Sequence, residues 1–160
     1  IFVGERLAVA APLLLPLGLA TLVLASLGAL SAGSLPRLAG YLTMASAGTL
    51  LAAVGVSGDK ALAAALYYLP QTTLAVAALF LLAELIARQR GELAGALVGG
   101  PAVRQPALLG GMFLLAGATL AGLPPFSGFV GKLLILRGAL GQVGGFALWA
   151  VLLLSGFYAV

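Results

Sequence analysis

The 160-residue sequence contains no cysteine and no histidine, and only 8% of its residues are charged. Without cysteine there is neither a disulfide framework nor a thiolate metal site. Without histidine the chain lacks the commonest metal ligand and the side chain that usually titrates near neutral pH. We therefore expect no bound metal, and nothing in the sequence indicates a cofactor. The eight lysines and arginines form no basic run, so nucleic-acid binding is unsupported.

Apolar residues make up 62% of the chain, and the mean hydropathy is +1.20. A soluble domain carries about 25% charged residues, so this surface is better suited to lipid than to water. Runs such as residues 75–82 do not alternate between apolar and polar residues, as strands of a membrane barrel do. The composition and these runs predict an all-α membrane protein.

Charges and turn residues divide the chain into five apolar spans, and a helix needs about 20 residues to cross a bilayer. The sequence predicts one membrane domain over residues 1–160 with five transmembrane helices. They lie near residues 7–32, 38–56, 61–87, 107–136 and 143–160. Because the chain does not begin with Met and stops inside an apolar run, we expect it to be part of a longer protein.

The fourth span is longer than a simple crossing requires and contains a predicted break in its middle. Pro124 and Pro125 remove two backbone donors, and Gly122 and Gly128 add conformational freedom on either side. Unpaired carbonyls at membrane depth are tolerated only beside protein or a water-filled cavity. Broken helices of this kind recur at ion sites in transporters.

Lys132 follows the predicted break by about two helical turns. A lysine inside a membrane is costly, and such residues generally serve a function. One interpretation is that Lys132 gains and loses a proton, with water at the break as the source. The positive N-terminal end of the second half-helix would lie near it. The alternative is that Lys132 extends to the membrane interface beside Arg137.

Glu84 is the one acidic residue well inside a predicted span. It precedes Arg88 by four residues, the favourable spacing and order for an ion pair on a helix. The sequence favours this pair, although a proton site at Glu84 stays open.

A second group of polar residues lies in the third span, beside Pro70. Gln71 and Thr72 are candidates for a polar relay, in which the amide of Gln71 conducts a proton only through water. Ordinary hydrogen bonding between helices explains such residues equally well. Ser46 and Gly48 in the second span suit close helix packing, and we assign them no chemistry.

Three runs resemble one family of membrane proteins, the proton-pumping antiporter-like subunits of respiratory complex I and of the Mrp (Pha) cation/proton antiporters. Residues 35–51, LPRLAGYLTMASAGTLL, resemble the family's helix-entry motif, and residues 121–132, AGLPPFSGFVGK, resemble its broken helix with the proton-carrying lysine. Residues 65–69, ALYYL, with 77–86, AALFLLAELI, are similar to the D-type subunit of the Mrp antiporters. One departure is Gln71, where the family often has a histidine.

The resemblance implies a fold of two inverted five-helix repeats, of which this chain would supply the second, broken at Pro124-Pro125. It implies a proton-translocating subunit of a multi-subunit Na⁺/H⁺ or K⁺/H⁺ antiporter in a bacterial plasma membrane. Lys132 would carry the proton, and the partners would be other membrane subunits. The chain would be a transporter subunit and not an enzyme. The alternative is a redox-driven pump subunit of complex I or a membrane hydrogenase, where electron transfer in partner subunits supplies the energy.

Overall fold

The computed structural model describes residues 2–56, 58–93, 95–99, 103–141 and 144–158, and in this part the chain is helical. The helices are α1 (Phe2–Leu30), α2 (Leu35–Gly55), α3 (Asp59–Arg90), α4 (Pro106–Ala121), α5 (Ser127–Gly138) and α6 (Gly145–Tyr158). A short 3-10 turn, η1 (Gly91–Leu93), follows α3. The prediction of an all-α chain is confirmed for these residues. Residues 143, 159 and 160 of the predicted fifth span lie outside the described part.

Three of the described helices are long and apolar enough to cross a membrane: residues 12–30 of α1, all of α2 and all of α3. At 1.5 Å per residue, α4 spans only about 24 Å and α5 only about 18 Å. Neither covers the hydrocarbon core alone. The predicted fourth span, residues 107–136, is therefore not one helix but two consecutive ones.

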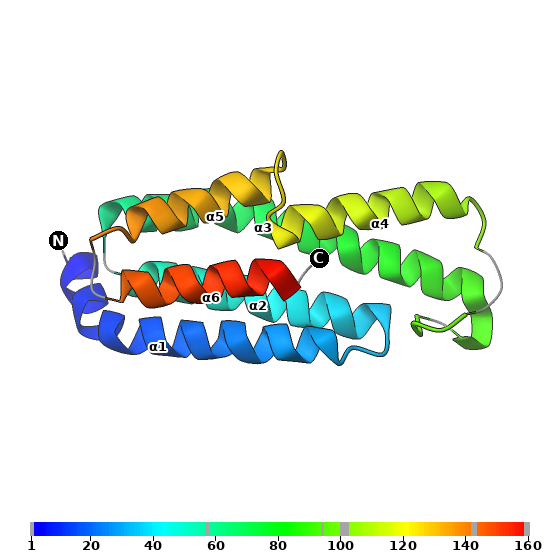
Figure 1. Ribbon diagram of the computed structural model, residues 1–160, viewed down its shortest axis with the longest axis horizontal. Coiled ribbons are helices and arrows are strands. Elements are labelled where there is room, and N and C mark those ends of the chain that lie inside the picture. Colours follow the sequence, from blue (N-terminus) through cyan, green and yellow to red (C-terminus); the bar gives the residue numbers. More distant parts are fainter. Residues whose placement is uncertain (1, 57, 94, 100–102, 142–143, 159–160) are drawn as a thin grey trace.

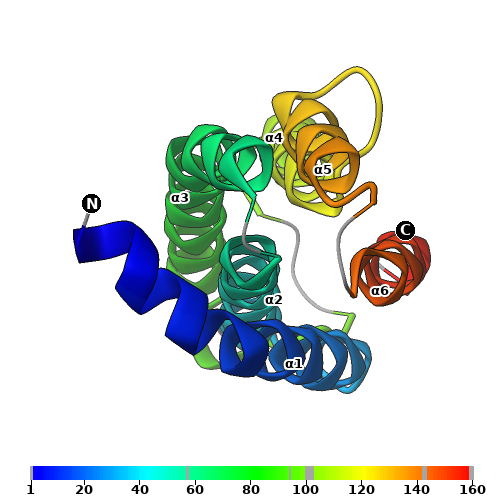
Figure 2. The same cartoon turned by 90° about the vertical axis from the view of Figure 1, so that its left-hand side faces the viewer.

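The two short helices lie end to end along α3 (Figure 1). Viewed along the bundle, α4 and α5 nearly overlap, with the connecting loop bulging outward between them (Figure 2). α3 contacts α4 through one half of its length and α5 through the other. α2 packs between α1 and α3, and α6 packs against α1 and α5. This arrangement places the junction of α4 and α5 beside the middle of α3.

Small residues let α1 and α2 approach closely, as is common between helices in membranes. A Cβ added to Gly48 would lie 2.8 Å from the backbone nitrogen of Leu22, so no larger residue fits. The predicted packing role of Gly48 agrees with this contact. Large apolar side chains instead face outward, among them Leu81 at 71% and Leu24 at 67% exposure. An apolar exterior around a core of small residues suits a lipid environment.

Pro70 lies inside α3 without interrupting it, since the helix continues from Asp59 to Arg90. At the far end of α3, Arg90 Nη1 donates to the carbonyl of Ala96 at 2.6 Å. The amide of Leu35 donates to the carbonyl of Gly95 at 2.7 Å. These bonds hold the connection after α3 against the start of α2.

Candidate functional site at the helix break

The break between α4 and α5 leaves three backbone carbonyls without their usual donors. The amides of Gly122 and Leu123 both donate to the carbonyl of Ala118, at 3.1 Å and 3.0 Å. Pro124 and Pro125 have no N–H to donate. The carbonyls of residues 119, 120 and 121 therefore lose the i+4 amides that would pair with them in a continuous helix.

Gly122 ends α4 in the left-handed conformation, with φ of 79°. Residues with a Cβ rarely adopt this conformation, so glycine is required here for more than flexibility. The following turn is closed by the amide of Phe126, which donates to the carbonyl of Leu123 at 3.0 Å. The Pro124-Pro125 peptide within it is cis. α5 then begins at Ser127.

Lys132 reaches back across this break. Its Nζ donates a hydrogen bond to the carbonyl oxygen of Ala121 at 2.8 Å. The side chain passes over Gly122, where an added Cβ would lie 2.8 Å from Lys132 Cδ. The ammonium thus faces the carbonyl end of α4, which is the negative end of that helix's dipole. Since Ala121 precedes Lys132 in the chain, the side chain reaches back across the break and not forward to Arg137.

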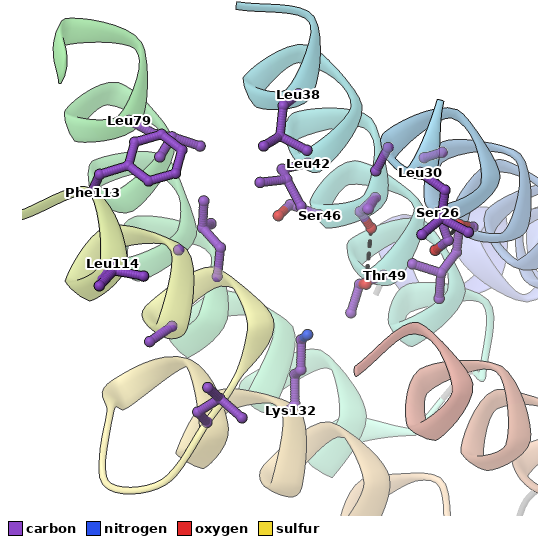
Figure 3. A pocket seen from close by; sticks show the side chains of 18 of the residues that line it. Ser26, Leu30, Leu38, Leu42, Ser46, Thr49, Leu79, Phe113, Leu114 and Lys132 are labelled. Atoms are coloured by element: carbon purple, nitrogen blue, oxygen red, sulfur yellow. Dashed lines mark hydrogen bonds between the residues drawn. The ribbon is translucent and has the colours of Figure 1, made fainter. Parts of the chain in front are cut away.

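A cavity of about 450 Å³ opens beside the Lys132 ammonium. Figure 3 shows the lysine pointing into this space from α5, with Ser46 and Thr49 of α2 on the other side. Tyr68 of α3 also lines the cavity, and most of the remaining wall is apolar. A water in liquid occupies about 30 Å³, so the space is large enough for several waters. Lys132 therefore has both a carbonyl hydrogen-bond acceptor and an adjacent cavity that can hold water.

Ser46 contributes a polar contact that the sequence alone did not indicate. Thr72 Oγ1 donates to Ser46 Oγ at 2.8 Å, and the two residues are buried. The hydroxyl of the buried Tyr68 lies close to both. The sequence offered one sign of this contact, a serine within an apolar span. Its partner could not be identified, because that depends on the register of α2 against α3.

Gln71 lies on a different side of α3 from Thr72. Its Oε1 and Nε2 atoms are buried, and neither has a hydrogen-bond partner among the described residues. An added Cβ on Gly128 would lie 3.4 Å from Gln71 Nε2 and 1.7 Å from the carbonyl oxygen of Thr119. Gln71 therefore lies against the break. The backbone there approaches so closely that only glycine fits at residue 128.

A second cavity, of about 650 Å³ and more open than the first, is lined by Gln71, Thr119 and Ser127. The Lys132 cavity is lined instead by Tyr68 and Ser46, the neighbours of Thr72. Gln71 and Thr72, predicted as members of one relay, thus belong to opposite sides of the broken helix.

Glu84 and Arg88 form an ion pair on the outer surface of α3. Arg88 Nε donates to Glu84 Oε1 at 2.7 Å, and the two side chains are 76% and 60% exposed. Neither residue lines the two cavities at the break. Within the described ranges, no three His, Cys, Asp or Glu side chains lie close enough to hold a metal ion.

A family model described as NADH:quinone oxidoreductase/Mrp antiporter, transmembrane, matches residues 3–157. The chain belongs to this family. The resemblance drawn from the three sequence motifs is therefore confirmed.

Proteins similar to this chain include D-type subunits of two bacterial antiporters. The chain is 40% identical to the D-type subunit of a probable K(+)/H(+) antiporter from Rhizobium meliloti, over 76% of this chain and 26% of that protein. It is 33% identical to the D-type subunit of an Na(+)/H(+) antiporter from Bacillus subtilis, over 84% of this chain and 27% of that protein. The chain thus spans about a quarter of the length of these relatives.

Among solved structures, the fold resembles a chain of the Mrp complex from Dietzia sp. DQ12-45-1b, with a TM-score of 0.76 and 30% sequence identity. The match covers 93% of this chain and 17% of that chain. The arrangement of helices in this member of the family therefore agrees with a segment of a known Mrp assembly.

Proposed function

We propose that this chain forms part of a proton-translocating subunit of a multi-subunit Na⁺/H⁺ or K⁺/H⁺ antiporter in a bacterial plasma membrane. Its relatives are named as D-type antiporter subunits, and the structural neighbour belongs to an Mrp complex. The observation that carries the proposal is Lys132, whose ammonium binds the last carbonyl of α4 beside a hydratable cavity. Its partners are the other membrane subunits of the same complex.

Residues 1–160 form one membrane domain with five spans in this proposal. α1, α2 and α3 each cross the bilayer, α4 and α5 cross it together as one broken span, and α6 begins the fifth. The combined length of the two halves is about 42 Å, enough for a single crossing with a break at its centre. The domain corresponds to the second of two inverted repeats, with a first repeat elsewhere in the full protein.

Lys132 is the proton carrier in this mechanism. As an ammonium it is held by the Ala121 carbonyl, which partly replaces lost hydration. When it releases a proton to water in the cavity, the neutral amine binds that carbonyl less strongly and is free to turn. Gly122, Pro124, Pro125 and Gly128 keep the carbonyl exposed by preventing a continuous helix. Gln71 and Thr72 supply polar groups on the two sides of the break.

The test is cation-driven proton exchange in everted vesicles that contain the complete complex. Addition of Na⁺ or K⁺ should release protons from acidified wild-type vesicles. We expect Lys132→Ala to lower the rate at least tenfold while the complex still assembles. Exchange at the wild-type rate with Lys132→Ala would rule out the proton-carrier role.

A redox-driven pump subunit is the second candidate, because the family also includes NADH:quinone oxidoreductase subunits. The helices would be the same, but the energy would come from electron transfer in partner proteins. Purification of the assembled complex separates the two candidates. Flavin or iron–sulfur proteins among the co-purified subunits would favour the redox-driven pump, and their absence from an active exchanger favours the antiporter.

A further inference from the structure

Three hydroxyl groups meet inside the bundle, where α2 packs against α3. Thr72 Oγ1 donates to Ser46 Oγ at 2.8 Å, and the Tyr68 hydroxyl lies close to both residues. Ser46, Tyr68 and Thr72 are 7%, 2% and 4% exposed. We call these three residues the hydroxyl cluster. Because each hydroxyl can donate and accept at once, the cluster provides a continuous set of positions for a proton.

The packing of α5 fixes the cluster beside Lys132. A Cβ added to Gly131 would lie 2.7 Å from Tyr68 Cδ2, so the tyrosine ring rests directly on the backbone of α5 at this residue. Gly131 immediately precedes Lys132. The close approach therefore ties the position of the Tyr68 ring to the same turn of α5 that carries the lysine.

Lys132 and the cluster share one cavity. Its lining includes Lys132, Tyr68 and Ser46, and its volume is about 450 Å³. In Figure 3 the Lys132 amine and the Ser46 hydroxyl face the same open space, from α5 and α2. Waters in that space would join the amine to the cluster, because polar groups stand at both ends of an otherwise apolar wall.

We propose that the hydroxyl cluster is the next proton-transfer station beside Lys132. A proton released by the ammonium passes to a cavity water, which gives up another of its protons to Ser46 Oγ. Ser46 releases its own hydroxyl proton to the Tyr68 oxygen as it accepts the new one, and Tyr68 in turn releases its hydroxyl proton to a second water in the cavity that it lines, so no hydroxyl ionises. This inference rests on the proposed function, since it requires Lys132 to carry protons.

A purely structural role for the cluster gives a different expectation. A single hydrogen bond between membrane helices contributes little to their association. Loss of one would then weaken the packing of α2 on α3 slightly and leave the transport rate unchanged. The transport rate and its sensitivity to deuterated water therefore separate a proton-transfer role from a structural one.

The experiment compares Ser46→Ala, Ser46→Thr and Tyr68→Phe in the complete complex. We expect Ser46→Ala and Tyr68→Phe to lower the maximal rate of proton exchange at least fivefold without changing the KM for the cation. The solvent deuterium isotope effect should increase, because proton transfer becomes rate-limiting. Ser46→Thr keeps a hydroxyl at this position and should restore most of the rate.

Thr49→Val is the matched control. Thr49 lines the same cavity from the same helix, but its hydroxyl donates to the carbonyl of Ala45 at 2.9 Å within α2. We expect this variant to exchange protons within twofold of the wild type. An equal loss in Thr49→Val would overturn the proposal, because any polar change in the cavity would then suffice.

Wild-type rates in both Ser46→Ala and Tyr68→Phe would also overturn the proposal. If Ser46→Ala fails to assemble, the exchange rate of Tyr68→Phe alone tests the proposal, since this variant keeps the ring that packs on Gly131. A slow Lys132→Ala with fast cluster variants would refute only this inference. A fast Lys132→Ala would refute the proposed function as well.

Discussion

Lys132 Nζ lies 2.8 Å from the carbonyl oxygen of Ala121, so the lysine of α5 closes the open end of α4. In a continuous helix the amide of residue 125 would donate to this carbonyl, but Pro125 has no N–H. The broken helix and the partly buried lysine are thus two parts of one arrangement. The break exposes the carbonyl that the ammonium needs, and the ammonium replaces the missing amide.

Gly122→Ala should damage this arrangement in two ways. A Cβ in the left-handed conformation costs about 1 kcal/mol, and it would lie 2.8 Å from Lys132 Cδ. We expect proton exchange to fall at least fivefold and thermal stability to decrease. The control is Gly117→Ala in the same cavity wall, where an added Cβ meets no atom within 4 Å. Equal effects of the two substitutions would contradict the assigned role of Gly122.

Pro124→Ala should partly repair the helix and thereby impair transport. The new amide at residue 124 can donate to the carbonyl of Leu120 and extend α4. We expect the end of α4 to move away from Lys132, and the exchange rate to fall several-fold. Hydrogen exchange of the amides around residues 120–124 would show slower exchange in the variant.

Pro106→Ala is the control for this substitution, because Pro106 begins α4, where the amide has no intrahelical partner. It should leave the exchange rate unchanged. Wild-type transport by Pro124→Ala, together with slower amide exchange at the break, would show that the break is dispensable.

Gln71→Met tests whether the unpaired amide of Gln71 serves transport. A buried amide without a partner costs about 1–3 kcal/mol, so methionine should match or raise the thermal stability. We expect the exchange rate to fall about threefold, because the amide would no longer hold water at the break. A stable variant that transports at the wild-type rate would remove Gln71 from the path.

Glu84→Gln should have little effect on either transport or stability. An exposed ion pair at i,i+4 spacing contributes about 0.3–0.5 kcal/mol. Since both side chains are mostly exposed and neither lines the two cavities, the exchange rate should stay within twofold of the wild type. A large loss of transport at unchanged assembly would instead identify Glu84 as a proton site.

The features that sequence alone revealed depend on local chemistry. Two adjacent prolines between glycines must end a helix, and the break occurs between Ala121 and Ser127 as the pattern indicated. The all-α fold followed from composition in the same way. The predicted spans differ from the helices mainly at their ends and at the break, which divides one predicted span into α4 and α5.

The features that the sequence did not reveal depend on contacts between helices. The sequence placed Lys132 about two turns beyond the break, but it did not show that the flexible side chain binds the Ala121 carbonyl across it. Ser46 was assigned to packing, because its partner Thr72 becomes evident only when α2 and α3 are in register. By contrast, the sequence could have predicted that Gln71 and Thr72 lie on different sides of α3, since consecutive positions on a helix face different directions.

The central claim is that Lys132 carries protons, and one comparison tests it most directly. Lys132→Met keeps the length of the side chain and removes its amine, while Lys60→Met removes the amine of an exposed lysine at the start of α3. Cation-driven proton exchange should be measured for both variants in the complete complex at matched assembly levels. We predict at least a tenfold loss for Lys132→Met and a rate within twofold of wild type for Lys60→Met. Wild-type exchange by Lys132→Met would contradict the claim.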